Sequence, residues 1–254
     1  MIRTVWSILN IVVSTMIFSA ITLGGAVLRV RSLSFYDWTA RTWSRWILWG
    51  SGSTVRVDGL ENIDPDAPQV LAGNHQSWFD VPAIASQLPK SFHFVAKKEL
   101  ESVPLFGRAW KAAGHISIDR TDRESAVRSL EQASRQLRAD ASAVVIFPEG
   151  TRADSDALRE FKKGAFMLAL HTGVDIVPIA VIGGREVLPK GSWIVTPGTI
   201  TIRIGSPIRT SDYTLETRDD LMRVTRDALR SLLPGSSLKR PDPTSNREHS
   251  ASVD

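Results

Sequence analysis

The sequence predicts an α/β fold, a single layered domain with a largely parallel mixed sheet flanked by helices, preceded by an N-terminal hydrophobic, membrane-anchoring helical segment. After residue 53, short apolar β-rich runs alternate with stretches of helical periodicity, a pattern typical of a parallel sheet covered by helices. A long uncharged run lies near the start of the chain. The length of 254 residues and the 43% hydrophobic composition suit one full domain with an appendage.

Composition divides the chain into three parts. Residues 1–50 contain the uncharged run and form the membrane-anchoring helical segment. Residues 51–233 form the folded domain, to which the motifs described below assign the catalysis. Residues 234–254 are rich in Ser, Pro and charge, and they are expected to be a disordered tail.

The N-terminal run extends from Thr4 to Leu28 without a charged residue. Because about 20 apolar residues at 1.5 Å each cross a hydrocarbon core, it is long enough to span a membrane. Its polar residues and the Gly24-Gly25 pair leave a helix embedded obliquely in one leaflet open as well. Its position near the start leaves a cleaved signal peptide open, although the sequence that follows favours retention.

An aromatic and basic stretch follows the run. Four of the eight tryptophans lie between Trp38 and Trp49, with arginines among them, which is a composition suited to the headgroup layer. Residues 1–50 hold five basic residues and one acidic residue, whereas the rest of the chain holds 26 of each. The excess positive charge therefore accompanies the apolar segment, which favours an anionic membrane surface over nucleic acid. By the positive-inside rule we expect a bacterial-type cytoplasmic membrane with the folded domain on the cytoplasmic side.

Several function classes lack their usual residues. The chain has no cysteine, which excludes a disulfide framework, a thiolate zinc site and a cysteine nucleophile. Its five histidines do not fall at metal-binding spacings, and the P-loop, G-x-G-x-x-G, G-x-S-x-G and H-E-x-x-H motifs are missing. We therefore expect no histidine-built metal site, and nucleotide hydrolysis, hydride transfer and zinc hydrolysis lack their usual signatures.

The alternating pattern gives the expected elements of the domain. The expected strands are Thr54–Val57, Gln69–Ala72, Phe92–Ala96, His115–Ile118, Ala143–Phe147, Ile176–Ile182 and parts of Trp193–Ile204. The expected helices are Trp78–Leu88, Arg123–Arg138, Phe161–His171 and Thr217–Leu233.

The first candidate site is the heptapeptide 74–80, N-H-Q-S-W-F-D, which follows an apolar strand and precedes a helix. Loops of this kind carry the sites of α/β sheets. Asp80 lies five residues beyond His75, close enough to hydrogen-bond the imidazole, fix its tautomer and stabilise the imidazolium formed when it removes a proton. A simple capping box of Ser77 and Asp80 explains the same spacing.

The second candidate site is the hexapeptide 147–152, F-P-E-G-T-R, directly after another apolar strand. Proline ends the strand and glycine permits a tight turn. Arg152 offers a forked donor that matches phosphate, and Glu149 can hold a hydroxyl group. An ordinary polar turn is the alternative. In a parallel sheet both loops lie at the same edge, and Lys98 and Arg120 near further strand ends favour an anionic ligand.

These residues resemble one family. The N-H-x-S-x-x-D and F-P-E-G-T-R segments match the two best-known motifs of the glycerolipid acyltransferases, the 1-acylglycerol-3-phosphate O-acyltransferase group. Residues 114–120 and 177–184 resemble two further motifs, so that the resemblance covers residues 70–184.

The resemblance implies an enzyme that moves an acyl group from acyl-CoA or acyl-carrier protein to the free hydroxyl of 1-acylglycerol-3-phosphate, giving phosphatidic acid in phospholipid biosynthesis. His75 is the general base and Asp80 orients it. The glycerol phosphate is held by the following residues: Glu149, Gly150, Thr151 and Arg152, with Arg120 and Lys98 assisting. The resemblance implies no metal or cofactor.

Three alternatives remain open at this point. Another lysolipid could serve as the acceptor, since the motifs are less specific for the acceptor than for the superfamily. A membrane-anchored hydrolase using Ser77 with His75 and Asp80 is a second alternative. A lipid-binding protein that keeps the fold without catalysis is the third.

Overall fold

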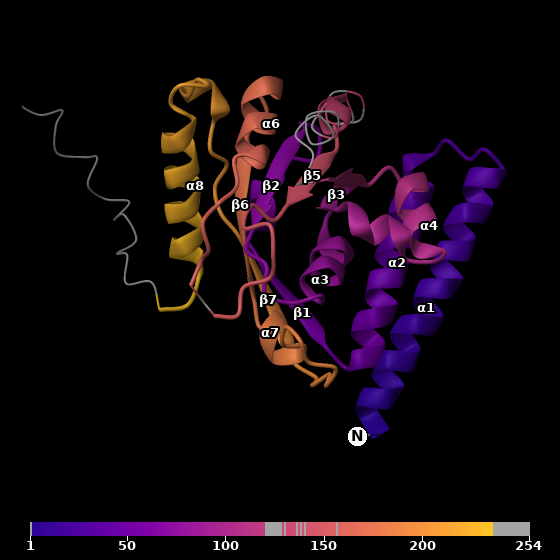
Figure 1. The fold of residues 1–254 in the computed structure, drawn as a ribbon. Coiled ribbons are helices and arrows are strands. Elements are labelled where there is room, and N and C mark those ends of the chain that lie inside the picture. The colour runs from indigo at the N-terminus through magenta and orange to yellow at the C-terminus, as the bar shows by residue number, and fades with distance from the viewer. Residues whose placement is uncertain are drawn as a thin grey trace, which may run out of the picture.

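Residues 2–119, 129, 131–135, 137, 139, 141–155 and 157–235 are described by a computed structural model (Figure 1). Their strands form one sheet in the order β1-β7-β6-β2-β5-β3-β4. Neighbouring strands are parallel except for β6 and β7, which are antiparallel. The predicted fold class is therefore confirmed.

The strands lie close to where the sequence pattern predicts them. Their bounds are β1 Thr54–Asp58, β2 Gln69–Gly73, β3 Phe92–Lys97, β4 Ile116–Ile118, β5 Ala143–Ile146, β6 Ile176–Ile182 and β7 Thr199–Ile204. Every residue of the neighbouring strands β2 and β5 is buried, because helices cover both faces of the sheet at its centre. Of the stretch predicted at 193–204, only the second half forms a strand.

Helices cover the two faces of the sheet unequally. The α-helices are α1 Ile2–Val27, α2 Leu33–Ser51, α3 Asp80–Gln87, α4 Phe106–Ala112, α6 Gly164–Thr172, α7 Gly184–Val187 and α8 Arg218–Leu232. The 3-10 helices are η1 Leu60–Asn62, η2 Lys98–Ser102 and η3 Thr210–Asp212. Helices α1 to α4 lie on one face of the sheet, and α6 and α8 lie on the other (Figure 1). Much of the helix predicted at 123–138 and nearly all of the tail at 234–254 fall outside the described residues.

Two hydrophobic cores separate these layers. The first lies between the sheet and α2, α3 and α4, and it includes Ile47 and Leu48 of α2. The second lies between the sheet and α6 and α8, and it includes Phe166 and Leu229. Since α2 contributes directly to the first core, the N-terminal helices pack as part of the folded layers.

Helix α1 runs antiparallel to α2 along its whole length. The Trp43 indole N–H donates to Thr15 Oγ1 at 3.1 Å, and Thr22 and Thr39 are hydrogen-bonded at 3.3 Å. At the other end of the pair the Gly50 backbone lies directly against the Asn10 side chain. Contacts at both ends therefore hold α1 against the folded domain.

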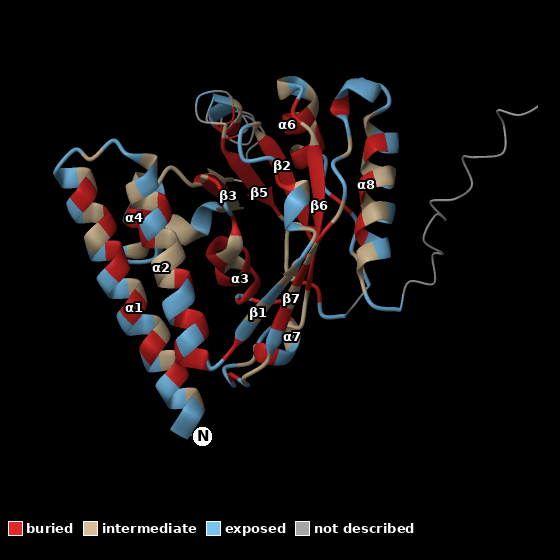
Figure 2. Ribbon diagram, turned by 180° about the vertical axis from the view of Figure 1, so that it is seen from behind, coloured by how far each residue is buried: buried red, intermediate tan, exposed pale blue. Residues whose placement is uncertain are grey.

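Helix α1 has one buried and one exposed face (Figure 2), and the polarity of these faces is the reverse of that of a helix in water. Its buried residues are mostly small and polar: Ser7, Asn10, Ser14, Phe18, Ser19, Thr22 and Gly25. Apart from Arg3, its exposed large residues are apolar: Ile2, Val5, Trp6, Leu9, Val12, Val13, Met16, Ile17 and Val27. By length and composition α1 is able to cross a membrane. The face it turns outward suits lipid better than water.

Candidate active site

Three loops meet at one edge of the sheet. Strand β2 has β5 on one side and β6 on the other, and both pairs are parallel. The carboxyl ends of these strands therefore lie together, and the segments 74–79, 147–152 and 183–188 all leave the sheet at this edge. The prediction that the two motif loops open on the same edge is confirmed.

The first loop forms a histidine–aspartate pair. His75 Nδ1 lies 2.8 Å from Asp80 Oδ2. The same carboxylate oxygen accepts hydrogen bonds from the backbone N–H groups of Gln76 and Ser77, at 2.7 and 2.8 Å. Asp80 is completely buried, while the His75 side chain keeps 14% of its surface exposed. Three donors on one oxygen stabilise the ionised carboxylate at a site where a lone buried charge is unfavourable.

This arrangement favours one tautomer of a neutral imidazole. An ionised carboxylate only accepts hydrogen bonds, so Nδ1 of His75 is the donor and Nε2 carries the lone pair. The ring also stacks on Phe147 with a centroid distance of 4.1 Å and an interplanar angle of 14°. The orientation of the imidazole is thereby held by one carboxylate and one aromatic ring.

The capping interpretation describes part of the same geometry. The Asp80 carboxylate does accept the Ser77 N–H, as in one half of a capping box. The Ser77 hydroxyl instead donates to the Leu188 carbonyl at 2.8 Å and accepts the Phe79 N–H at 3.2 Å. Asp80 therefore both organises the start of α3 and contacts His75. The hydroxyl of Ser77 is bonded to backbone groups, which disfavours the hydrolase alternative.

The second loop is a tight turn with a buried glutamate. The Gly150 N–H donates to the Phe147 carbonyl at 3.0 Å, and Gly150 has a φ of 74°, which suits glycine. Glu149 is buried, and its two oxygens accept the backbone N–H groups of His75 at 3.1 Å and Arg159 at 3.0 Å. Burial raises the pKa of the Glu149 carboxyl, and the two backbone hydrogen bonds oppose that rise.

Hydrogen bonds tie the two motif loops together. Besides the bond from His75 N–H to Glu149, the Ala153 N–H donates to the His75 carbonyl at 2.7 Å. The Gln76 amide group donates to the Ser155 carbonyl at 3.1 Å. The sequence interpretation expected Glu149 to hold a substrate hydroxyl; in this structure both of its oxygens have backbone partners, and the residue joins the loops.

Arg152 lies above an exposed tryptophan. Its guanidinium carbon is 4.6 Å from the centroid of the Trp78 ring, a cation–π contact. Desolvation lowers the pKa of Arg152, and the nearby carboxylates of Asp80 and Asp154 oppose that shift. Thr151 is half-buried beside it. The sequence pattern did not single out Trp78, because an aromatic residue inside a motif gives no sign of which charged group it meets.

Of the two further basic residues that the sequence predicts, the structure describes only Lys98. Lys98 begins η2 at the end of β3, which β5 separates from β2. Its ammonium group pairs with Asp119 at 3.3 Å and is largely exposed. Arg120 lies outside the described residues.

Two positioning residues were missed by the sequence interpretation. The Asn74 side chain donates to the Val181 carbonyl at 2.9 Å and accepts the Val181 N–H at 2.7 Å, so it clamps the loop to β6. A Cβ atom at Gly184 would lie 2.2 Å from Asp80 Oδ1. Only a glycine lets α7 approach the carboxylate this closely. Neither role is visible in the sequence pattern, because a contact such as that of Asn74 with Val181 joins residues 107 positions apart and leaves no local pattern.

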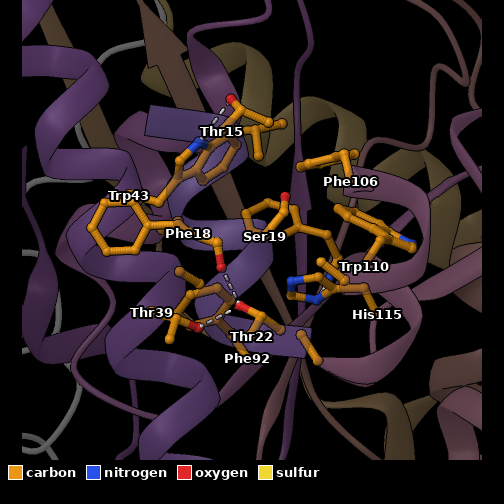
Figure 3. A pocket seen from close by; sticks show the side chains of 16 residues that line it. Thr15, Phe18, Ser19, Thr22, Thr39, Trp43, Phe92, Phe106, Trp110 and His115 are labelled. Carbon is orange, nitrogen blue, oxygen red and sulfur yellow. Dashed lines mark hydrogen bonds between the residues drawn. The ribbon is translucent and has the colours of Figure 1, made fainter. Parts of the chain in front are cut away.

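An apolar pocket lies between the N-terminal helices and the first face of the sheet (Figure 3). Its walls come from α1, α2, α3, α4, β3 and the turn between α4 and β4, and they include Phe18, Trp43, Val81, Phe92, Phe106, Trp110 and His115. Burial lowers the pKa of His115 to about 3, helped by His93, so the ring is neutral at neutral pH. The pocket therefore offers an uncharged wall close to the start of α3, where Asp80 lies.

The described residues contain no group of three or more His, Asp or Glu side chains arranged to hold a metal ion. The chemistry available at the sheet edge is that of an oriented base beside a guanidinium group. Such a pair activates a hydroxyl group, and the guanidinium suits an anionic substituent on the same molecule.

Sequence comparison identifies the family of this chain. A family model described as Acyltransferase matches residues 54–182, which contain both motif loops. The chain belongs to this acyltransferase family, and the resemblance of its motifs is thereby confirmed.

Individual relatives carry a more particular name. A 1-acyl-sn-glycerol-3-phosphate acyltransferase of Chlamydomonas reinhardtii is 35% identical, covering 74% of this chain and 57% of the relative. The chloroplastic 1-acyl-sn-glycerol-3-phosphate acyltransferase LPAT1 of Arabidopsis thaliana is 39% identical, covering 65% and 48%. The chain thus spans about half the length of these curated relatives.

A solved structure is similar over almost the whole chain. The crystal structure of the 1-acyl-sn-glycerophosphate (LPA) acyltransferase PlsC from Thermotoga maritima superposes with a TM-score of 0.77 at 25% identity. The match covers 91% of this chain and 93% of that chain. The likeness therefore includes helices on both faces of the sheet.

Replacing Gly184 tests whether the close approach of α7 positions Asp80. We expect Gly184→Ala to lower kcat for acyl transfer about 100-fold, because misplacing a catalytic group by ~1 Å has an effect of that size. Gly164→Ala is the matched control, since a Cβ atom there meets nothing within 4 Å. Circular dichroism checks that both variants are folded. Equal activities of the two folded variants would contradict this role.

Replacing Glu149 tests its role in joining the loops. In Glu149→Gln the amide NH2 meets one of two backbone donors, so one buried N–H loses its acceptor. We expect a loss of about 1–3 kcal/mol in the free energy of unfolding, together with reduced activity. Glu160→Gln, at an exposed position nearby in the chain, is the control. Urea denaturation measures the effect, and an unchanged stability would contradict it.

Proposed function

We propose that the chain transfers an acyl group from an acyl thioester, acyl-CoA or acyl-carrier protein, to the free hydroxyl of 1-acylglycerol-3-phosphate, forming phosphatidic acid in phospholipid biosynthesis. The observation that carries the proposal is the oriented His75–Asp80 pair at the same sheet edge as Arg152. The names of the relatives support the acceptor. The thioester donor follows from the family and from the need for a leaving group.

The proposed reaction is a direct transfer. Nε2 of His75 removes the proton from the acceptor hydroxyl while that oxygen attacks the thioester carbonyl carbon. The tetrahedral intermediate collapses with cleavage of the carbon–sulfur bond, and the departing thiolate takes the proton back from the imidazolium. An ester and a free thiol are formed, so no covalent enzyme intermediate and no redox partner is needed.

The neighbouring residues support each step. Asp80 holds the donor tautomer at Nδ1 and stabilises the imidazolium that forms in the transition state. Glu149 holds the backbone of His75 in place, because its carboxylate accepts a hydrogen bond from the His75 backbone N–H. The pair is therefore preorganised before substrate arrives, which removes much of the cost of orientation at the moment of reaction.

The acceptor phosphate is assigned to the second loop. The guanidinium of Arg152 offers forked donors to a phosphate. The Trp78 ring holds the guanidinium by a cation–π contact. A carboxylate partner would occupy the guanidinium N–H groups, whereas the ring leaves them available to the phosphate. Gly150 and Thr151 lie beside Arg152 in this loop and complete the proposed phosphate site. Assistance by Lys98 and Arg120 remains a prediction from the family resemblance.

The apolar pocket suits an acyl chain. Its walls are aromatic and aliphatic, and His115 adds no charge to them at neutral pH. It borders Val81, the residue next to Asp80 in α3, so a chain lying in it reaches towards the base. We assign the pocket to one of the two acyl chains present in the reaction.

Helix α1 is proposed to lie in one leaflet of a membrane. Its exposed apolar face needs a lipid environment, whereas its polar face packs on α2 and α4 for most of its length. A helix held against the folded domain in this way is poorly placed to cross the opposite leaflet. The bacterial-type cytoplasmic membrane expected from charge is not supported by the relatives, one of which is chloroplastic.

The direct test is a product assay with the purified full chain. We expect phosphatidic acid from 1-acylglycerol-3-phosphate and an acyl thioester, with other lysophospholipids consumed more slowly in competition. Separate reactions with acyl-CoA and acyl-carrier protein identify the donor. Release of free fatty acid without transfer would contradict the proposal, and preferred use of another lysolipid would contradict the assigned acceptor.

Removing the base tests the mechanism. We expect His75→Ala to lower kcat by about 10²–10⁴-fold, which is the usual contribution of a general base. His171→Ala on α6 is the control, because that residue is exposed and lies on the other face of the sheet. Near-normal turnover of folded His75→Ala would contradict the assigned role.

Removing the guanidinium tests phosphate recognition. A charged hydrogen bond contributes roughly 1.5–3 kcal/mol, so Arg152→Ala should lower kcat/KM for the phosphate-bearing acceptor about 10- to 100-fold. A monoacylglycerol acceptor, which lacks the phosphate, should be little affected. Arg223→Ala is the control, because the Arg223 side chain lies on the exposed face of α8. Equal losses with both acceptors would leave Arg152 only a structural role.

A further inference from the structure

The connection between α7 and β7 presents two large apolar side chains to the outside. In residues 188–198, Trp193 is 79% exposed and its neighbour Ile194 is 65% exposed. On either side of this pair, Val187 and Val195 are buried in the first core. The connection is thus anchored in the protein on both sides of an exposed apolar tip.

Backbone hydrogen bonds hold the tip in one conformation. The Ser192 N–H donates to the Pro189 carbonyl at 3.1 Å, around Gly191 with a φ of 80°. The Ile194 N–H donates to the Ser192 hydroxyl at 3.0 Å, and the Thr196 N–H donates to the Val187 carbonyl at 2.9 Å. The exposure of the pair therefore belongs to a structured turn, and the turn presents it at low entropic cost.

The tip lies at the same end of the molecule as the outward-facing part of the N-terminal helices. A Cβ atom at Gly52 would meet both Arg3, 2.7 Å away, and Pro197, 3.5 Å away, so α1, α2 and the connection converge here. Both ribbon views show α7 and the connection near the ends of α1 and α2 (Figures 1 and 2). Exposed apolar residues of this end include Ile2, Trp6 and Trp49.

The composition of the connection favours a lipid surface as its partner. Its only charged residue is Lys190, and tryptophan is the side chain that prefers the boundary between headgroups and hydrocarbon. The first turns of α1, whose apolar face we place in lipid, lie close to this connection, since Arg3 and Pro197 both approach Gly52. A protein partner would need a matching groove, whereas a bilayer accepts an isolated protruding pair.

We propose that Trp193 and Ile194 insert into the leaflet in which α1 lies and form a second point of membrane contact. This inference rests on the proposed membrane placement of the catalytic domain. Two separate points of contact fix the tilt of the domain on the surface, which a single helix does not do.

The second contact is linked directly to the catalytic loop. Leu188, the first residue of the connection, accepts the Ser77 hydroxyl at 2.8 Å, and Gly184 of α7 lies against Asp80. A tip held in the membrane therefore sets the position of the His75 loop relative to the lipid surface. We assign Trp193 and Ile194 a positioning role for access of the membrane-resident acceptor.

The absence of cysteine from the chain allows a site-specific test. A single cysteine is introduced as Ile194→Cys, labelled with an environment-sensitive fluorophore, and the full chain is bound to vesicles of phosphatidylcholine and phosphatidylglycerol. We expect quenching by spin-labelled lipid and protection from aqueous iodide. Val13→Cys on the exposed face of α1 is the positive control, and Leu215→Cys, next to α8 on the other side of the sheet, is the negative control.

The controls separate the possible failures. If the Ile194 position is quenched by iodide like Leu215 while Val13 is protected, the second contact is overturned and the placement of α1 stands. If Val13 is also quenched by iodide, both the second contact and the membrane placement are overturned. Neither outcome depends on the acyl transfer reaction, so the proposed chemistry is tested separately.

An activity measurement tests the consequence. We expect Trp193→Ser with Ile194→Ser to lower kcat/KM for lysolipid in vesicles by more than about 10-fold, since the burial of each of the two side chains in lipid contributes a factor of at least about 10. The rate on a short-chain, water-soluble acceptor should stay within about 2-fold. Leu215→Ser is the matched control. An unchanged rate on vesicles, or an equal loss on both acceptors, would overturn the positioning role.

Discussion

The buried carboxylate of Asp80 is the interaction on which the site depends. One of its oxygens accepts hydrogen bonds from the His75 ring nitrogen and from two backbone N–H groups. A single charge therefore determines the tautomer of the imidazole and stabilises both the turn after β2 and the start of α3. Its other oxygen faces the backbone of Gly184. Such an ion is stable in the interior only because these donors replace water. The same donors hold it against the imidazole, as the proposed general-base mechanism requires.

The order of the strands brings the parts of this site together. Because β2 lies between β5 and β6, segments from three distant parts of the chain leave the sheet side by side. Glu149 and Asn74 then fix the first loop to its two neighbours, one by a backbone contact at His75 and the other by a double contact at Val181. The helices α1 and α2 cover the same face as α3, which places the proposed lipid-facing surface and the catalytic loop on one scaffold.

The alternating pattern was sufficient to predict the sheet, because its central strands are short apolar runs buried on both faces. It predicted a strand in parts of residues 193–204 without saying which part, and the apolar Trp193 and Ile194 belong to an exposed turn before β7. The motif spacing predicted the contact of His75 with Asp80, which is local. It did not predict that the Glu149 carboxylate accepts backbone N–H groups or that the Arg152 guanidinium lies over the Trp78 ring. These contacts arise only when strands far apart in sequence become neighbours.

The central claim is that His75 and Asp80 act as one unit in acyl transfer, and a double-mutant cycle tests it most directly. The measurement is kcat/KM for 1-acylglycerol-3-phosphate in His75→Ala, Asp80→Asn and the double variant, each shown to be folded. If Asp80 acts through the imidazole, Asp80→Asn lowers the rate strongly when His75 is present and has almost no effect once His75 is replaced. An equal factor in both backgrounds would show that the two residues act independently and would contradict the account.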